Sequence, residues 1–173
     1  PGRIGLGYFA DDRGRIVTEM SIMALEENVF FLITAAVAEL HDFEWLRNHL
    51  PQGAALTLEN VTEKFSCQIL SGPKSREILS EVTDADLTLP WLTHQSCQIA
   101  GRWLQLVRVS FAGELGWELH TKVEDTATVF DAVWEAGQKH GLKPFGMFAL
   151  DSLRLEKGYR AWKQDLSTDY TVL

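Results

Sequence analysis

One carboxylate stands out in the stretch from Phe111 to His120, which reads Phe-Ala-Gly-Glu-Leu-Gly-Trp-Glu-Leu-His. From Gly116 onward, strand alternation predicts apolar residues on one face and Glu118 with His120 on the other. A carboxylate that faces a cavity can accept two parallel N–H bonds from a planar, amidine-like ligand. An ordinary half-exposed strand glutamate has the same pattern, so both interpretations of Glu118 remain open at this point.

A second pattern with chemical potential runs from Leu150 to Arg160. Leu150 and Leu153 have a core-facing spacing with charged residues between them, which is typical of a packed amphipathic helix. The glycine that follows predicts the end of this helix, so that Tyr159 turns away from it. An aromatic ring beside a helix end can line the site of a planar ligand.

Other acidic and metal-binding residue types suggest less specific chemistry. Glu19 follows an apolar strand pattern, and a solvent-facing strand residue is its ordinary interpretation. His41 and Asp42 resemble a catalytic pair, although the favoured interpretation is that Asp42 caps a helix. The five histidines are scattered, and Cys67 and Cys97 are far apart, so we expect two reduced cysteines and no metal site.

The composition is that of an ordinary globular protein of 173 residues, with 46% hydrophobic and 23% charged residues. A formal net charge of −8 argues against a general nucleic-acid surface, which needs clustered Lys and Arg. No apolar run approaches a membrane span, so we expect no membrane partner. The sequence also shows no signal-peptide pattern, and a cytoplasmic or organelle-matrix location is therefore expected.

The order of the expected elements predicts an α+β fold. Strands are expected at 3–9, 15–25, 28–34, 54–61, 65–70, 95–99, 102–110 and 116–121. Helices are expected at 35–50, 71–79, 124–140 and 144–157. Because groups of antiparallel strands alternate with covering helices, two βββα-like lobes are favoured over one parallel sheet. The expected lobes are residues 1–80 and 81–173.

Three segments together resemble a known family. Residues 113–118 (Gly-Glu-Leu-Gly-Trp-Glu), 151–159 (Asp-Ser-Leu-Arg-Leu-Glu-Lys-Gly-Tyr) and 14–20 (Gly-Arg-Ile-Val-Thr-Glu-Met) carry the similarity. They resemble the tetrahydrofolate-binding domain shared by the glycine-cleavage T-protein (aminomethyltransferase) and by dimethylglycine and sarcosine dehydrogenases. The resemblance runs from about residue 3 to residue 173, and the Glu-Lys-Gly-Tyr-Arg ending is closer to the dehydrogenase branch.

The resemblance implies roles for individual residues. Glu118 stands where the family's carboxylate holds the pterin ring, and Tyr159 stands where a tyrosine lines the folate site. Phe111 keeps the ring face at a position where family members often have tyrosine. Glu19 occupies the position of the catalytic aspartate and is one methylene longer. Leu150 replaces an arginine that helps the T-protein bind substrate, which again points toward the dehydrogenase-type domain.

The resemblance also implies a reaction, namely transfer of a one-carbon unit from a small-molecule amine donor to tetrahydrofolate. It implies that the chain is part of a longer protein, with a C-terminal barrel-like domain and, in dehydrogenases, an upstream domain that carries FAD. A basic cluster at Lys157, Arg160 and Lys163 could meet the glutamate tail of folate or form a solvated helix end. Two alternatives are a non-catalytic folate-binding or regulatory module and a folate-dependent demethylase.

Overall fold

The computed structural model describes residues 1–173, which divide into two compact units. Unit 1 contains Pro1 and residues 3–61 and 160–173, and unit 2 contains Gly2 and residues 62–159. The expected boundary near residue 80 is therefore replaced by one at Val61 and Thr62. The physical reason is strand pairing, because the strand that begins at Phe65 pairs with the strand that ends at Lys122.

Unit 1 is built on a three-stranded antiparallel sheet with the order β1-β2-β3. Its strands are β1 (Ile4–Ala10), β2 (Ile16–Glu26) and β3 (Val29–Ile33). The turn between β1 and β2 follows the Asp-Gly pattern, since Gly14 has φ 75° and the Asp11 carboxylate accepts the N–H of Arg13 at 2.9 Å. These three strands confirm the sequence-based prediction for this region.

One helix accompanies this sheet, formed by the 3-10 turn η1 (Ala36–Ala38) and α1 (Glu39–Asn48). The prediction that Asp42 caps the helix is wrong, because α1 begins three residues earlier. Asp42 is instead buried and accepts hydrogen bonds from the hydroxyls of Thr18, at 3.0 Å, and Thr34. The C-terminal segment belongs to the same unit because the Trp162 indole N–H donates to the Val17 carbonyl at 2.8 Å.

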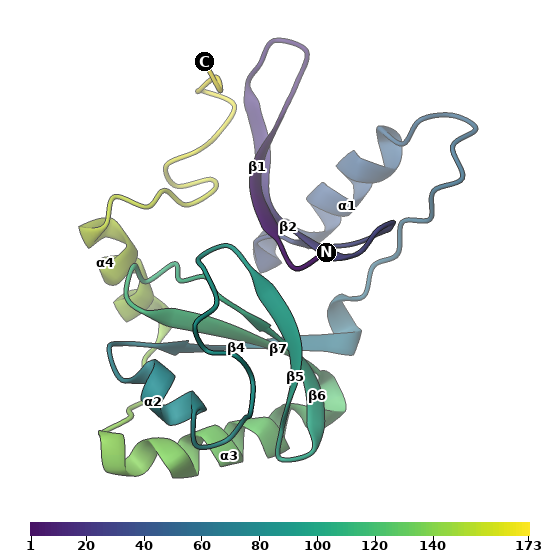
Figure 1. The fold of residues 1–173 in the computed structure, drawn as a ribbon. Coiled ribbons are helices and arrows are strands. Elements are labelled where there is room, and N and C mark those ends of the chain that lie inside the picture. Colours follow the sequence, from purple (N-terminus) through teal and green to yellow (C-terminus); the bar gives the residue numbers. More distant parts are fainter. The chain divides into compact units, whose positions relative to one another are not determined.

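Unit 2 contains a four-stranded antiparallel sheet with the order β4-β7-β6-β5 (Figure 1). Its strands are β4 (Phe65–Ser71), β5 (His94–Ile99), β6 (Arg102–Val107) and β7 (Gly116–Lys122). Its helices are α2 (Ser75–Leu79), α3 (Thr126–Gly137) and α4 (Met147–Glu156), with 3-10 turns η2 (Thr62–Lys64), η3 (Val123–Asp125) and η4 (Gln138–His140). The strand and helix pattern of both units confirms the α+β prediction.

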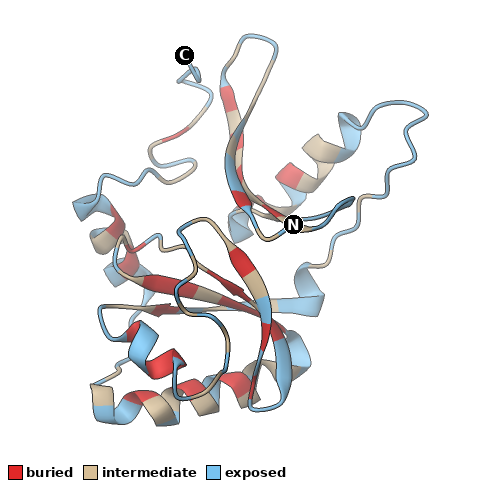
Figure 2. Ribbon diagram, in the orientation of Figure 1, coloured by how far each residue is buried: buried red, intermediate tan, exposed pale blue.

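The core of unit 2 lies between one face of its sheet and the helices α2 and α3 (Figure 2). Leu106, Trp117 and Leu119 from the sheet are essentially fully buried, as are Leu79 of α2 and Val129 of α3. A fully buried side chain of this size contributes about 1.5–3 kcal/mol through the hydrophobic effect. This packing fixes which face of β7 points into the core and therefore which face presents its polar side chains.

Two local predictions are wrong. Residues 54–61 form no strand, because their backbone makes local bonds such as the Leu56 N–H to the Ala54 carbonyl at 2.9 Å. The predicted helix at 35–50 includes Leu40 and Leu50 on its apolar stripe, yet both are exposed, since the helix buries Ala38 and Asp42 instead. The apolar spacing was present, but hydrogen bonds from Thr18 of β2 and from Thr34, which follows β3, to Asp42 set the buried side of the helix.

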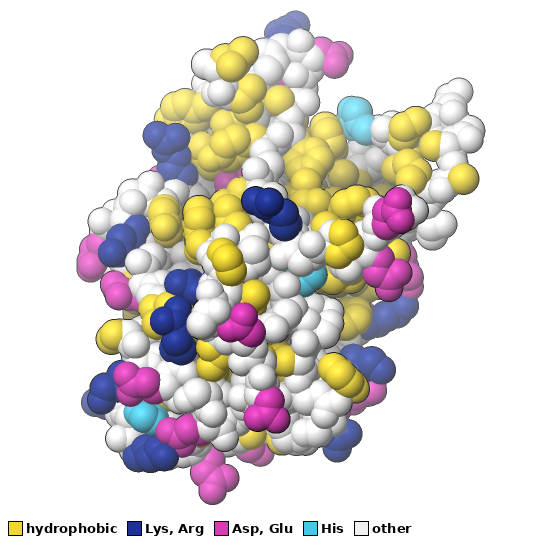
Figure 3. Space-filling view, in the orientation of Figure 1, with side chains coloured by type: hydrophobic (Ala, Val, Ile, Leu, Met, Phe, Trp, Pro, Cys, Tyr) yellow, Lys and Arg dark blue, Asp and Glu magenta, His cyan; other side chains and the backbone are white.

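The molecular surface carries mixed charge. On the face shown in Figure 3, acidic side chains are interspersed with Lys and Arg rather than separated from them. None of the helices is long and apolar enough to cross a membrane.

Candidate functional site

The position of Glu118 follows from the alternation of β7. Trp117, Leu119 and Thr121 are buried on the core side of the strand, while Glu118 and His120 lie on the other face. The Glu118 side chain is 19% exposed, and its Oε2 lies 2.9 Å from Nε2 of His120. The structure therefore confirms the predicted alternation and adds a neighbour that orients the carboxylate.

A thiol on the neighbouring strand completes this polar cluster. Cys67 of β4 is directly opposite His120 in the β4–β7 register, and its Sγ lies 3.7 Å from His120 Nε2. The residue is exposed on the edge strand, although its thiol is largely surrounded by protein. Burial, followed by the negative charge of Glu118, raises the pKa of the Cys67 thiol, so it is protonated and weakly nucleophilic at neutral pH.

Two glycines permit the close approach that precedes β7. Gly113 has φ 75°, and a Cβ atom there would lie 2.0 Å from Cγ of Lys157. A Cβ atom on Gly116 would lie 2.7 Å from Cβ of Ser110. Arg108 donates from Nη1 to the Gly116 carbonyl at 3.0 Å, which fixes the first residue of the strand. The two glycines of the Gly-Glu-Leu-Gly motif are thus required by packing.

Phe111 and Tyr159 form an aromatic pair in unit 2. Their ring centroids are 6.4 Å apart with an interplanar angle of 19°, and each residue is 38% exposed. The predicted helix end is confirmed, because α4 stops at Glu156 and Gly158 has φ 69°. Tyr159 is then held by a bond from its N–H to the Arg154 carbonyl at 2.9 Å.

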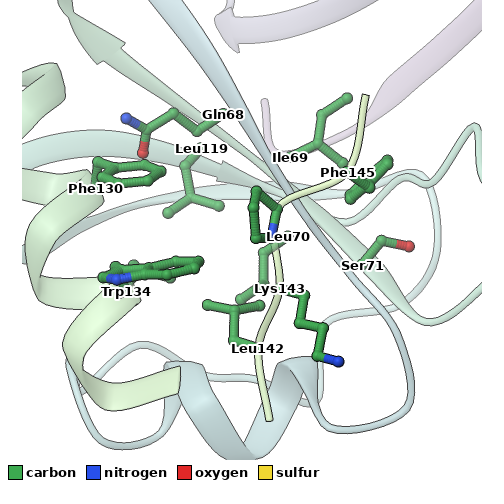
Figure 4. Close-up of a pocket in the computed structure, with 12 residues that line it drawn as sticks. Gln68, Ile69, Leu70, Ser71, Leu119, Phe130, Trp134, Leu142, Lys143 and Phe145 are labelled. Carbon is green, nitrogen blue, oxygen red and sulfur yellow. The ribbon is translucent and has the colours of Figure 1, made fainter. Parts of the chain in front are cut away.

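Tyr159 also lines a cavity of about 390 Å³ within unit 2. The other lining residues are Trp91, Arg108, Ser110, Gly113, Glu114 and Leu115. A second cavity of about 260 Å³ lies between β4, α3 and residues 142–145, where Phe130 and Trp134 stack 5.9 Å apart (Figure 4). The cavity of about 390 Å³ combines the Tyr159 ring with polar groups, which suits a planar polar ligand.

Glu19 lies in unit 1, on β2 opposite Tyr8 of β1. Its neighbours Thr18 and Met20 are buried, so Glu19 occupies the other face of the strand and is partly buried. Burial raises the pKa of the Glu19 carboxyl, while a hydrogen bond from the Trp162 backbone opposes that shift. This environment favours a carboxyl group that holds its proton at higher pH than usual.

The predicted site residues do not all lie in the same unit. Phe111 is paired with Tyr159, and Glu118 is paired with His120, all within unit 2, whereas Glu19 belongs to unit 1. The predicted basic cluster is divided, since Lys157 belongs to unit 2 while Arg160 and Lys163 belong to unit 1.

Three supporting residues had no role assigned from sequence. Cys67 and His120 meet only through strand pairing, and Arg154 is a buried arginine inside a helical motif. The role of His120 could have been predicted from its spacing, because residues two apart on a strand share a face and His120 is two residues after Glu118.

The whole chain matches one family model. The model is described as the GCVT N-terminal domain, and the match covers residues 1–173. This chain belongs to that family. The α+β fold expected from the sequence and the resemblance to aminomethyltransferases and related dehydrogenases are thereby confirmed.

Curated relatives include enzymes and one regulatory protein. Mitochondrial dimethylglycine dehydrogenase of Mus musculus is 34% identical over 99% of this chain and 20% of its own length. Mitochondrial sarcosine dehydrogenase of Mus musculus is 38% identical over 88% of this chain and 17% of its own length. The mitochondrial pyruvate dehydrogenase phosphatase regulatory subunit of Mus musculus is 32% identical over 94% of this chain and 19% of its own length. The chain thus spans about a fifth of the length of these relatives.

A solved structure shares the fold. The glycine cleavage system aminomethyltransferase T from Bartonella henselae matches with a TM-score of 0.83 and 22% identity. The match covers 98% of this chain and 45% of that protein. The chain therefore has an aminomethyltransferase-type fold.

Proposed function

We propose that this chain is the tetrahydrofolate-binding domain of a dimethylglycine or sarcosine dehydrogenase-type enzyme. In this role it accepts a one-carbon unit from an amine donor and gives methylene-tetrahydrofolate. The FAD used by such an enzyme would belong to a domain outside this chain. The observation that carries the proposal is the Phe111–Tyr159 pair beside a polar cavity, within a fold whose family match spans the whole chain.

Two separate groups of residues in unit 2, the Phe111–Tyr159 pair and the Glu118–His120 pair, have chemistry that suits a flat, nitrogen-rich ring. Two nearly parallel aromatic rings, each partly exposed, offer apolar faces of the right shape. The Glu118 carboxylate can accept N–H bonds from a pterin, and the bond from His120 limits its rotation. When bound, tetrahydrofolate would supply the nitrogens that capture the one-carbon unit.

Glu19 is proposed as the proton-transfer group. Its carboxyl stands at the family's acidic position, and its raised pKa makes both protonation states accessible closer to neutral pH. A general acid or base works best when its pKa lies near the working pH, which supports this assignment. The longer side chain of glutamate places the carboxyl one methylene farther from the backbone than aspartate would.

Calorimetric titration with tetrahydrofolate tests the binding part of the proposal. Glu118→Gln keeps the shape but removes the charge, and loss of a charge-assisted hydrogen bond should weaken binding by about 10- to 100-fold. Glu124→Gln is the matched control, because the Glu124 side chain is 76% exposed in the same unit. Equal affinity of Glu118→Gln and the unchanged chain would refute the role of Glu118, and an absence of binding by both would refute the function.

A second candidate function is a non-catalytic regulatory module. It is favoured by the similarity to a protein named as a regulatory subunit and by the replacement of aspartate with Glu19. Formation of methylene-tetrahydrofolate by the full-length protein, lost in Glu19→Ala with tetrahydrofolate binding retained, would exclude this candidate. Retention of folate binding without any such activity would support it.

A further inference from the structure

The polar face of unit 2 gathers three different metal-ligating atoms. The Cys67 thiol, the Glu118 carboxylate and the His120 imidazole have ligand atoms that all lie within 4.8 Å of one another. They are a sulfur, an oxygen and a nitrogen donor, the set that zinc-class cations accept in proteins. The cluster was not expected from sequence, because Cys67 is far along the chain from the other two residues.

The spacing of these atoms fits tetrahedral coordination. With usual zinc bond lengths, adjacent sulfur and nitrogen ligands are about 3.6 Å apart, and nitrogen and oxygen ligands are about 3.4 Å apart. The corresponding distances here are 3.7 Å between Cys67 Sγ and His120 Nε2 and 2.9 Å between His120 Nε2 and Glu118 Oε2. The third pair, Cys67 Sγ and a Glu118 oxygen, lies within 4.8 Å, so rotation of the Glu118 side chain adjusts both of its distances when the cation binds.

The strands hold the three side chains in place. Cys67 and His120 are direct partners in the antiparallel ladder, and Glu118 is two residues before His120 on the same face. Trp117 and Leu119, which alternate with them, are anchored in the core. His120 is buried, whereas the Glu118 side chain is 19% exposed, so one ligand is fixed and another gives access from solvent.

We propose that Cys67, Glu118 and His120 form a binding site for a zinc-class divalent cation. Binding forms a metal–sulfur bond and releases the thiol proton to solvent. It also forms a metal–nitrogen bond at Nε2, for which the imidazole carries its proton on Nδ1. Glu118 contributes one oxygen, and a fourth position remains open for water.

The site has a consequence for folate binding that rests on the proposed function. A cation held by Glu118 occupies the carboxylate that would otherwise accept pterin N–H bonds. The two ligands therefore compete for Glu118, and the cation acts as an inhibitor of folate binding. Cys67 and His120 then determine how strongly the metal competes.

Cobalt titration of the reduced chain tests the site, because thiolate coordination to Co²⁺ gives a near-ultraviolet charge-transfer band. We expect one Co²⁺ per chain, displaced by Zn²⁺, with the band absent in Cys67→Ala. Zn²⁺ affinity should fall more than about 100-fold in Cys67→Ala and His120→Gln, since loss of an outer hydrogen-bond partner alone costs 10- to 100-fold. Cys97→Ala is the matched control, because this second cysteine lies on the core side of the same sheet.

The outcomes separate the two proposals. The site is refuted if no Co²⁺ binds, if Cys67→Ala keeps the band, or if Cys97→Ala removes it while the chain remains folded by circular dichroism. Tetrahydrofolate affinity measured without metal reports on the proposed function alone. Weaker folate binding in the presence of Zn²⁺, restored in Cys67→Ala, supports the competition at Glu118, whereas unchanged folate binding with Zn²⁺ bound refutes it.

Discussion

Arg154 donates from Nη1 to the carbonyl of Tyr159 at 2.9 Å, while the Tyr159 N–H donates back to the Arg154 carbonyl at the same distance. Arg154 is only 2% exposed, and its guanidinium also binds Asp151. The last turn of α4 thus fixes the backbone of the tyrosine that lines the cavity. Arg154 lines neither of the two cavities, yet its bonds fix the position of the Tyr159 backbone.

Replacing this arginine should affect stability and folate binding together. Arg154→Met removes the bond to the Tyr159 carbonyl, and loss of a charged hydrogen bond costs about 1.5–3 kcal/mol in the free energy of unfolding. Tetrahydrofolate binding should weaken because the ring of Tyr159 is released. Glu124→Gln is the control, since its side chain is 76% exposed and its ion pair with the exposed Lys122 contributes about 1 kcal/mol or less. Urea unfolding and calorimetry of both variants measure the two effects, and equal loss in both would contradict this account.

The close approach at Gly113 predicts a graded pair of glycine substitutions. Gly113→Ala forces a left-handed alanine, costing about 1–2 kcal/mol, and places a methyl group against Lys157. Overpacking adds about 1–3 kcal/mol, so Gly113→Ala should lose clearly more stability than the left-handed backbone alone would cost. Gly101→Ala, with φ 73° and nothing within 4 Å of its Cβ position, should show the backbone term only. Similar midpoints of thermal unfolding for the two variants would show that the Lys157 side chain moves aside without a measurable loss of stability.

The sequence predicted the elements that rest on local chemistry. The β1–β2 turn, the strands of β5 to β7 and the end of α4 at Gly158 all follow from alternation and from glycines with positive φ. Apolar and polar residues also alternate in residues 54–61, but alternation alone does not provide a partner strand. In this segment the backbone forms local hydrogen bonds instead. The boundary between the units was not predicted because it depends on the pairing of β4 with β7, two strands that are far apart in the sequence.

The candidate site was predictable in part for the same reason. The face of Glu118 follows from the strand period, and the stacking of Phe111 on Tyr159 fits two residues already placed by the family resemblance. The contact between Cys67 and His120 required the register of β4 against β7. The role of Asp42 was predicted wrongly because helix capping depends on the local sequence. Its hydrogen-bond partners, Thr18 and Thr34, lie elsewhere along the chain.

The burial of Asp42 predicts a strong effect on the stability of unit 1. Asp42→Ala leaves the Thr18 hydroxyl buried without its acceptor, and we expect a loss of about 1–3 kcal/mol in the free energy of unfolding. Arg47→Gln is the control on the same helix, because the Arg47 side chain is 56% exposed and its pair with Glu44 is worth about 1 kcal/mol or less. Guanidinium unfolding monitored by tryptophan fluorescence compares the two. An Asp42→Ala chain as stable as the unchanged protein would mean that the Thr18 and Thr34 hydroxyls form hydrogen bonds with water instead.

The raised pKa of Glu19 predicts a pH-dependent difference between the unchanged chain and Glu19→Gln. Burial disfavours the charged form in the folded state, so the folded chain binds the proton more tightly than the unfolded chain does. The contribution of Glu19 to stability is therefore fully present below its ordinary pKa of 4.5 and is lost as pH rises through the raised folded value. Urea unfolding at several pH values should show Glu19→Gln gaining stability relative to the unchanged chain across that window and no further change above it. A difference that moved in the opposite direction would show that the hydrogen bond from the Trp162 backbone outweighs burial and that Glu19 is held ionised.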